Sequence, residues 1–303
     1  MIGLTLIIFF ADAQKDFLNE ANVNNLVIDK TLETNDQIVK EIEDQGTEFW
    51  YNLPLNQVYS SANSLMAEVH TDKLSKRIIG LWIIDTMTKM EKKVADGLIE
   101  DIKWSPSGKF LAYLKLEYVK DISKPLPFHI KREPFFNTEK LCVYNLLTNE
   151  IYALIRPVNC LGLEFLWSPT NDDLAYSYVD TEKNKYLLNV FDAENNQIHI
   201  IDELILCSLW NYTWSSNSEM LAYTKPLQME TLINEEVPLK AEIFISDRYG
   251  SQKKQLTNTP ASELFVKWLP DGKNIITMID KHPENDKSKF EFYNLLLKKK
   301  AGK

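Results

Sequence analysis

The sequence has few of the residues that supply catalytic, metal-binding or redox chemistry. Its 303 residues include four histidines, three cysteines and nine glycines. No histidine or cysteine pair has the HExxH or CxxC spacing of a metal site, and no GxGxxG or Walker loop is present to hold phosphates. The GxSxG elbow of a serine hydrolase is also missing. We therefore expect no catalytic residue, metal or cofactor, and the sequence favours a non-enzymatic protein without settling the question.

The sequence also has fewer basic than acidic residues and no long hydrophobic run. Lys and Arg number 34 against 43 Asp and Glu, a net charge of −9, which argues against nucleic-acid binding because phosphates need a basic face. The apolar run over residues 2–10 is too short to span a bilayer. It precedes Ala11-Asp12-Ala13, a small-x-small cleavage pattern, so residues 1–13 are interpreted as a signal peptide and the protein as periplasmic or secreted. Because a basic n-region is missing, a start further upstream or a buried strand stays an alternative.

The remaining polar candidates are expected to have structural roles. Cys142, Cys160 and Cys207 lack metal spacing and are predicted to be buried thiols. His199 lies in an alternating Ile-His-Ile run and is expected on one face of a strand. The acidic segment Asn171–Asp173 lacks the spacing of a calcium loop and is predicted to be a turn.

A repeat predicts the fold. Its first pattern is an aromatic residue, a turn rich in Ser, Pro, Asn, Asp or Gly, and a run similar to Leu-Ala-Tyr. The copies begin at Trp104, Trp167, Trp214, Trp268 and, in degenerate form, Tyr59. Each copy predicts two strands joined by a tight turn, since these residue types preset or tolerate turn angles. Because the tryptophans recur at equivalent positions, we expect them to pack between repeats rather than stack on a ligand.

A second pattern, a β-rich run ending in Asp or Asn, alternates with the first. Its copies end at Asp29, Asp85, Asn145, Asp192, Asp247 and Asn294. Two hairpins per repeat make a four-stranded sheet, and sheets recurring every 45 to 63 residues predict an all-β β-propeller. We expect about six four-stranded blades in a single domain over residues 14–303, with repeats starting near 58, 102, 165, 212 and 266. A half-blade over 26–45 is expected to help close the ring against the C-terminal blade. Since Phe290–Asn294 competes with it for that place, a truncated larger propeller stays an alternative.

The paired motifs resemble the repeats of TolB-type propellers, also called WD40-like or PD40 repeats. The resemblance rests on the form WSPxGxxLAY and on IFISDRYGSQKKQLT at residues 243–257, and it covers about residues 26–297. Departures at Tyr59, Ser216 and Asn171–Asp173 indicate a diverged member. The same repeats form the propeller of prolyl-oligopeptidase and dipeptidyl-peptidase-type serine peptidases. The resemblance implies the fold and does not choose among functions, because propellers host unrelated ones.

Two insertions join equivalent strands, so both are expected to leave the same face of the disc. Residues 118–140 are basic and aromatic, and residues 226–240 are acidic and apolar. Binding residues often lie on loops held by a rigid scaffold, and aromatic and Arg side chains are frequent interface anchors. We predict that the binding site for a protein partner consists of Phe128, His129, Arg132, Phe135 and Phe136. The alternative is that the two insertions pack on each other.

Resemblance to TolB-type propellers, taken together with the absence of a catalytic motif, implies a non-enzymatic scaffold that binds a protein partner. We expect this scaffold to be exported and monomeric. The enzyme-class alternative is the propeller portion of a prolyl-oligopeptidase or dipeptidyl-peptidase-type serine peptidase without its hydrolase domain. A propeller lyase acting on an acidic saccharide is disfavoured, because histidines are few and the acidic balance repels a polyanion.

Overall fold

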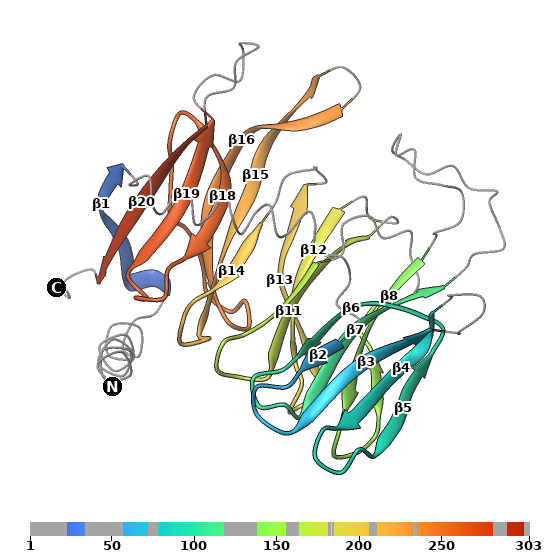
Figure 1. The fold of residues 1–303 in the computed structure, drawn as a ribbon. Helices are drawn as coiled ribbons and strands as arrows, with labels where there is room; N and C mark the ends of the chain where they lie inside the picture. Colours follow the sequence, from blue (N-terminus) through green and yellow to red (C-terminus); the bar gives the residue numbers. More distant parts are fainter. Residues whose placement is uncertain are drawn as a thin grey trace.

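The computed structural model describes residues 23–33, 57–71, 78–117, 138–155, 164–180, 183, 185–205, 211–232, 235–280 and 290–299. Apart from a short 3-10 turn at Val23–Asn25 (η1), these residues form strands and the turns between them. The strands make five antiparallel four-stranded sheets (Figure 1), so the all-β prediction is confirmed.

We number the sheets as blades in chain order. Blade 1 contains β2 (Gln57–Tyr59), β3 (Leu65–Thr71), β4 (Ile78–Asp85) and β5 (Glu91–Asp96). Blade 2 contains β6 (Leu98–Trp104), β7 (Phe110–Glu117), β8 (Thr138–Asn145) and β9 (Ile151–Ala153). Blade 3 contains β10 (Glu164–Trp167), β11 (Asp173–Asp180), β12 (Lys185–Asp192) and β13 (Gln197–Ile205). Blade 4 contains β14 (Tyr212–Trp214), β15 (Met220–Leu232), β16 (Glu235–Asp247) and β17 (Lys253–Gln255). Blade 5 contains β18 (Ser262–Trp268), β19 (Asn274–Asp280), β20 (Phe290–Lys299) and β1 (Leu26–Glu33).

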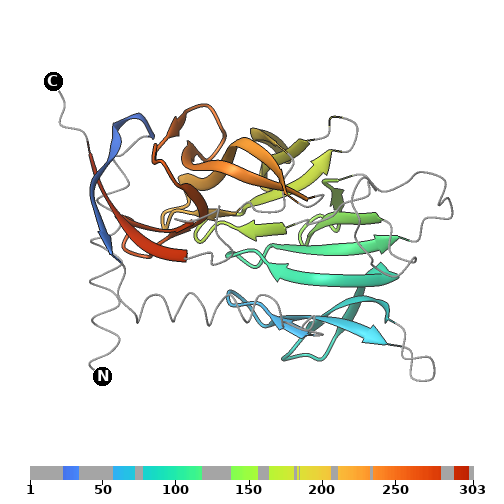
Figure 2. The same cartoon turned by 90° about the horizontal axis from the view of Figure 1, so that it is seen from above.

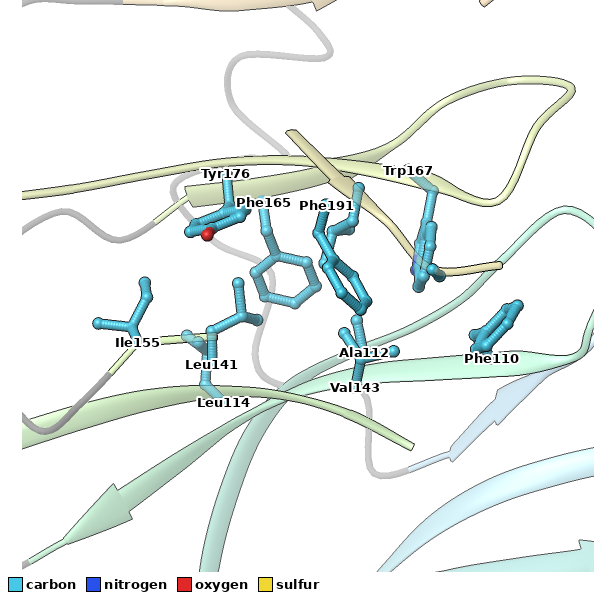
Figure 3. Packing of buried hydrophobic residues seen from close by; sticks show 12 residues of the cluster. Phe110, Ala112, Leu114, Leu141, Val143, Ile155, Phe165, Trp167, Tyr176 and Phe191 are labelled. Carbon is cyan, nitrogen blue, oxygen red and sulfur yellow. The ribbon is translucent and has the colours of Figure 1, made fainter. Parts of the chain in front are cut away.

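Consecutive blades pack face to face, as the view from above shows (Figure 2). Four apolar cores of the described residues lie at the four boundaries from blade 1 to blade 5. Between blades 2 and 3, for example, Phe165, Trp167 and Phe191 point toward Ala112 and Val143 (Figure 3). Repeated four-stranded sheets stacked in this way are the architecture of a β-propeller.

The two ends of the described chain meet in one blade, and this corrects the expected blade number. Strand β1 pairs antiparallel with β20, from Leu26 opposite Lys299 to Glu33 opposite Tyr293. The N-terminal and C-terminal copies of the second motif are therefore neighbouring strands of blade 5 rather than competitors for one place. The described residues accordingly give five blades where the sequence predicts about six, and the pairing of the N-terminal strand with the C-terminal blade is confirmed.

The Asp or Asn at the end of the second motif caps the turn that follows it. Asp85 Oδ1 accepts hydrogen bonds from the amides of Met87 and Thr88, at 2.8 and 3.0 Å. Asn145 does the same for Leu147 and Thr148, at 2.9 and 3.3 Å. Such side chains favour tight turns because they satisfy turn amides that no strand neighbour reaches.

The repeated tryptophans join each blade to the one before it. Trp104 Nε1 donates to the carbonyl of Val58 at 2.9 Å, Trp167 Nε1 to that of Lys103 at 3.0 Å, and Trp214 Nε1 to that of Leu166 at 3.1 Å. Each acceptor precedes the aromatic residue of the preceding repeat by one position. The expectation of packing between repeats is confirmed for these three residues, and Trp268 is likewise buried.

Several sequence predictions fall outside the described residues. They include the interpretation of residues 1–13 as a signal peptide and the burial of Cys160 and Cys207. Cys142 is described and is buried in blade 2, as predicted. No helix among the described residues is long and apolar enough to cross a membrane.

Candidate functional site

The five residues predicted to bind a partner lie outside the described part of the chain. Phe128, His129, Arg132, Phe135 and Phe136 fall between the end of β7 at Glu117 and the start of β8 at Thr138. Those two strand ends are directly opposite each other in the blade 2 ladder. Residues 118–137 therefore connect these two strands at one end of the central hairpin of blade 2.

The second insertion prolongs a hairpin of blade 4. Strands β15 and β16 pair as far as Leu232 opposite Glu235, with register irregularities between Pro226 and Met229. Each strand has 13 residues, whereas the second and third strands of the other blades have seven to ten. The expected insertion is thus largely two continued strands, which extend from the rest of blade 4 (Figure 1).

The turns between the first and second strands of each blade, here called the inner turns, lie at the other end of the blades from these two insertions. Hydrogen bonds that involve side chains join the inner turns of neighbouring blades. Asn63 Nδ2 of blade 1 donates to the carbonyl of Gly108 in blade 2 at 3.2 Å. The Ser107 hydroxyl of blade 2 donates to Asp172 Oδ2 of blade 3 at 2.6 Å. The Thr170 amide of blade 3 donates to the Ser218 hydroxyl of blade 4 at 2.8 Å. Polar groups at this end are therefore engaged in contacts between blades.

At the same end, blades 3 and 4 share a charged cluster, which is the strongest candidate for a chemically distinctive site. Asp173 and Asp192 face each other across β11 and β12 of blade 3. Arg248 of blade 4 places its Nε 3.6 Å from Asp173 Oδ2 and its Nη1 3.7 Å from Glu219. The Arg248 guanidinium also contacts the Tyr249 hydroxyl, and that hydroxyl donates to Asp192 at 3.0 Å.

Burial sets the electrostatics of this cluster. The side chain of Asp173 is 3% exposed, and this burial raises its pKa to about 6, although Arg248 opposes the rise. Burial also works to raise the pKa of Asp192, but hydrogen bonds from Asn195 and Tyr249 outweigh it and hold that pKa below its usual range. Arg248 thus compensates a buried carboxylate across a blade boundary.

A glycine allows the turn of blade 4 to approach blade 3. Gly250 follows Tyr249 and has φ +77°, a left-handed conformation that glycine adopts without a Cβ penalty. A Cβ at this position would lie 2.8 Å from the carbonyl oxygen of Ile200 in β13. His199, the preceding residue of β13, stacks on Tyr249 with 4.2 Å between ring centroids. His199 therefore lies on a strand face in contact with an aromatic ring, as predicted for a face residue.

No motif in the sequence predicts this cluster, although the repeat contains a clue to it. Asp173 occupies the position that Phe110 and Met220 occupy in blades 2 and 4, and all three are buried. A carboxylate at a repeat position that is elsewhere apolar needs a partner, because unpaired buried charge is costly. The partner, Arg248, belongs to the next blade and follows no recognisable spacing from Asp173.

A second polar group lies on blade 1. His70 stacks on Trp82 with 4.2 Å between ring centroids, and Lys93 Nζ lies 4.8 Å from the centroid of the same Trp82 ring. His70 Nε2 is 3.3 Å from Glu68 Oε2. Across the described residues, no group of three or more His, Cys, Asp or Glu side chains has a geometry suited to a metal ion.

No protein-family model matches this sequence, and no curated protein matches it. Solved structures similar to this chain are propellers. The β-propeller domain of the Trilobed protease from Pyrococcus furiosus is 14% identical, with a TM-score of 0.47, over 80% of this chain and 69% of that one. TolB from Acinetobacter baumannii is 15% identical, with a TM-score of 0.40, over 84% and 58%. Dipeptidyl peptidase 4 from Porphyromonas gingivalis is 10% identical, with a TM-score of 0.48, over 89% and 41%.

The chain therefore spans well under half of the dipeptidyl peptidase and somewhat over half of TolB. The repeat motifs of the sequence resemble the same two kinds of protein, TolB and the propeller-containing peptidases.

Proposed function

We propose that this protein is a non-enzymatic scaffold that binds a protein partner at the end of the propeller opposite the inner turns. One observation carries the proposal: the central hairpin of blade 4 is prolonged at that end, and blade 2 has a long connection between its strands there. The connection between the second and third strands is short in blade 3, at residues 181–184, whereas blade 2 has residues 118–137 there. Blade 4 has its two 13-residue strands at the equivalent place.

The distribution of polar contacts supports this choice of end. Side chains at the inner turns, such as Ser107, Asp172 and Thr170, form hydrogen bonds between neighbouring blades. Extensions on a rigid repeat scaffold are where binding residues usually lie. Residues 118–137 include Phe128, His129, Arg132, Phe135 and Phe136, types that commonly anchor interfaces.

The test is partner capture by matched variants. Replacing Phe135 and Phe136 with Ala should reduce capture about tenfold or more, because aromatic anchors contribute most of the binding energy. Replacing residues 118–137 with the blade 3 connection, Thr181–Asn184, should remove capture of the same proteins. Capture is quantified by mass spectrometry of proteins cross-linked to each variant.

The control variant carries Met87→Ala and Met90→Ala in the β4–β5 turn. These side chains are 81% and 73% exposed and lie at the inner-turn end, so capture should be unchanged. Each variant should also keep the thermal unfolding midpoint of the original protein to within a few degrees. Full capture by the Phe135 and Phe136 double variant, or loss with the methionine variant, would contradict the proposed surface.

We also propose that the scaffold acts in the periplasm or outside the cell. The support is the apolar run over residues 2–10 followed by Ala11-Asp12-Ala13. The intact mass of the protein from its native source should then lack residues 1–13. A mass that retains them contradicts cleavage at this position, and a mass larger by a hydrolase-sized domain favours the peptidase alternative.

A further inference from the structure

Two glutamates are fully buried where blade 4 meets blade 5. Glu242 lies on β16 and is 0% exposed, and Glu263 lies on β18 and is 1% exposed. Strand β18 packs against β16 at this boundary, and the Ala241 amide donates to the Ser262 hydroxyl at 2.9 Å. The two carboxyl groups therefore lie within a joint between blades, away from water.

Threonines link the two carboxyl groups into one network. Glu242 accepts hydrogen bonds from the Thr257 hydroxyl at 2.7 Å and from the Thr259 amide at 3.0 Å. The Thr259 hydroxyl is 3.4 Å from Glu263 Oε1, and the Thr277 hydroxyl of β19 donates to Glu263 Oε2. Thr259 thus contacts both glutamates, one through its main chain and the other through its side chain.

The charges around the network do not balance if both carboxyl groups are ionised. On β16, Lys240 Nζ lies 3.3 Å from Glu242 Oε1. On β15, Lys225 is opposite Glu242 in register, but its ammonium binds Asp202 of blade 3 at 2.7 Å. Among the described residues, Lys240 thus pairs with Glu242 and no ion pair joins a cation to Glu263. A buried uncompensated charge is costly.

We propose that Glu263 and Glu242 form a proton-sensitive joint, in which a single bound proton holds blade 5, with its N-terminal strand β1, against blade 4. Loss of the proton leaves two buried negative charges in one network and weakens this boundary. The boundary between blades 4 and 5 is therefore more stable at mildly acidic pH and less stable toward neutral and alkaline pH.

The direction of this pH dependence follows from proton binding by Glu263 in the closed and in the opened boundary. Burial raises the pKa of Glu263 to about 7 from an ordinary 4.5, and the charge of Glu242 adds to the rise. The closed joint thus binds the proton more tightly than the opened one. Its contribution to stability is complete below about pH 4.5, declines as the pH rises toward 7 and is lost above that.

Hydrogen exchange of β16 and β18, corrected for the intrinsic effect of pH, tests the joint. Between pH 6 and 7 the opening equilibrium should rise by up to about tenfold, the limit for release of one proton, and then level off. In the Glu263→Gln variant, which keeps the shape and removes the charge, this rise should be absent. Asp173→Asn, at the other boundary of blade 4, is the matched control and should retain it. Equal pH dependence in the original protein and in Glu263→Gln would overturn the proposal.

A second measurement does not depend on the folding of a variant. Carbon-13 NMR of glutamate carboxyl groups in the original protein should show one carboxyl that titrates close to pH 7. If every glutamate carboxyl titrates below about pH 5.5, near the ordinary range, no such proton is held and the proposal fails.

Discussion

The boundary between blades 2 and 3 and the boundary between blades 3 and 4 are built from the same repeat but differ in chemistry. In both, a tryptophan indole donates to a carbonyl of the preceding blade, at 3.0 Å for Trp167 and 3.1 Å for Trp214. At the start of its second strand, blade 2 has Phe110, which packs on Trp167 of blade 3. Blade 3 has Asp173 at that place, and it faces Arg248 of blade 4.

The difference shows how one boundary of a repeat protein becomes specific without a change of fold. An apolar contact such as Phe110 on Trp167 is compatible with any neighbour that presents an apolar surface. Asp173 is compatible only with a neighbour that supplies a cation, because an unpaired buried carboxylate is strongly unfavourable. Asp173 therefore favours packing of blade 3 against blade 4, which supplies Arg248.

The largest expected effect is at the apolar boundary. Trp167→Ala should lower the free energy of unfolding by about 3–5 kcal/mol, because it empties part of the core in Figure 3 and removes the hydrogen bond to Lys103. Urea unfolding measures the loss. Met87→Ala, at an exposed position, is the control and should change the value by about 0.5 kcal/mol or less. A similar small loss for Trp167→Ala would mean that the boundary is not a core.

The charged boundary should respond to both mutation and pH. Arg248→Ala leaves Asp173 buried without its cation and should cost about 3 kcal/mol at pH 8. Since the pKa of Asp173 is already raised to about 6, the carboxyl is protonated at pH 5 and the cost there should be clearly smaller. Urea unfolding at the two pH values tests this, and an equal cost at both would show that Asp173 does not depend on Arg248.

A double substitution makes the charged boundary resemble the apolar one. Asp173→Leu combined with Arg248→Met should bring the free energy of unfolding back to within about 1 kcal/mol of the original protein, because buried ion pairs are often replaceable by apolar residues. The two single variants complete a thermodynamic cycle. If the double variant is as unstable as the sum of the single ones, the two residues do not interact, and the ion pair does not define the boundary.

The fold is predictable from the sequence because the repeat is local and recurs. The turn chemistry of Asp85 and Asn145 and the positions of the tryptophans are visible in single motifs. The described residues give one blade fewer than the sequence predicts, because the N-terminal copy of the second motif adds the fourth strand to blade 5 and starts no blade of its own. The Asp173–Arg248 pair is not visible in any single motif, because its members are 75 positions apart in sequence and meet only when two blades pack.

The smallest expected effect tests whether the burial of an ion pair, or the distance between its charges, distinguishes the boundary between blades 3 and 4 from that between blades 2 and 3. Lys109 of blade 2 and Glu194 of blade 3 form an ion pair at 2.8 Å, shorter than Arg248 with Asp173, but their side chains are 46% and 59% exposed. Lys109→Ala should therefore cost about 0.5 kcal/mol or less, and less still in high salt, because water already screens the pair. Urea unfolding at low and high salt measures it. A cost equal to that of Arg248→Ala would show that ion-pair distance, and not the burial of Asp173, distinguishes the two boundaries.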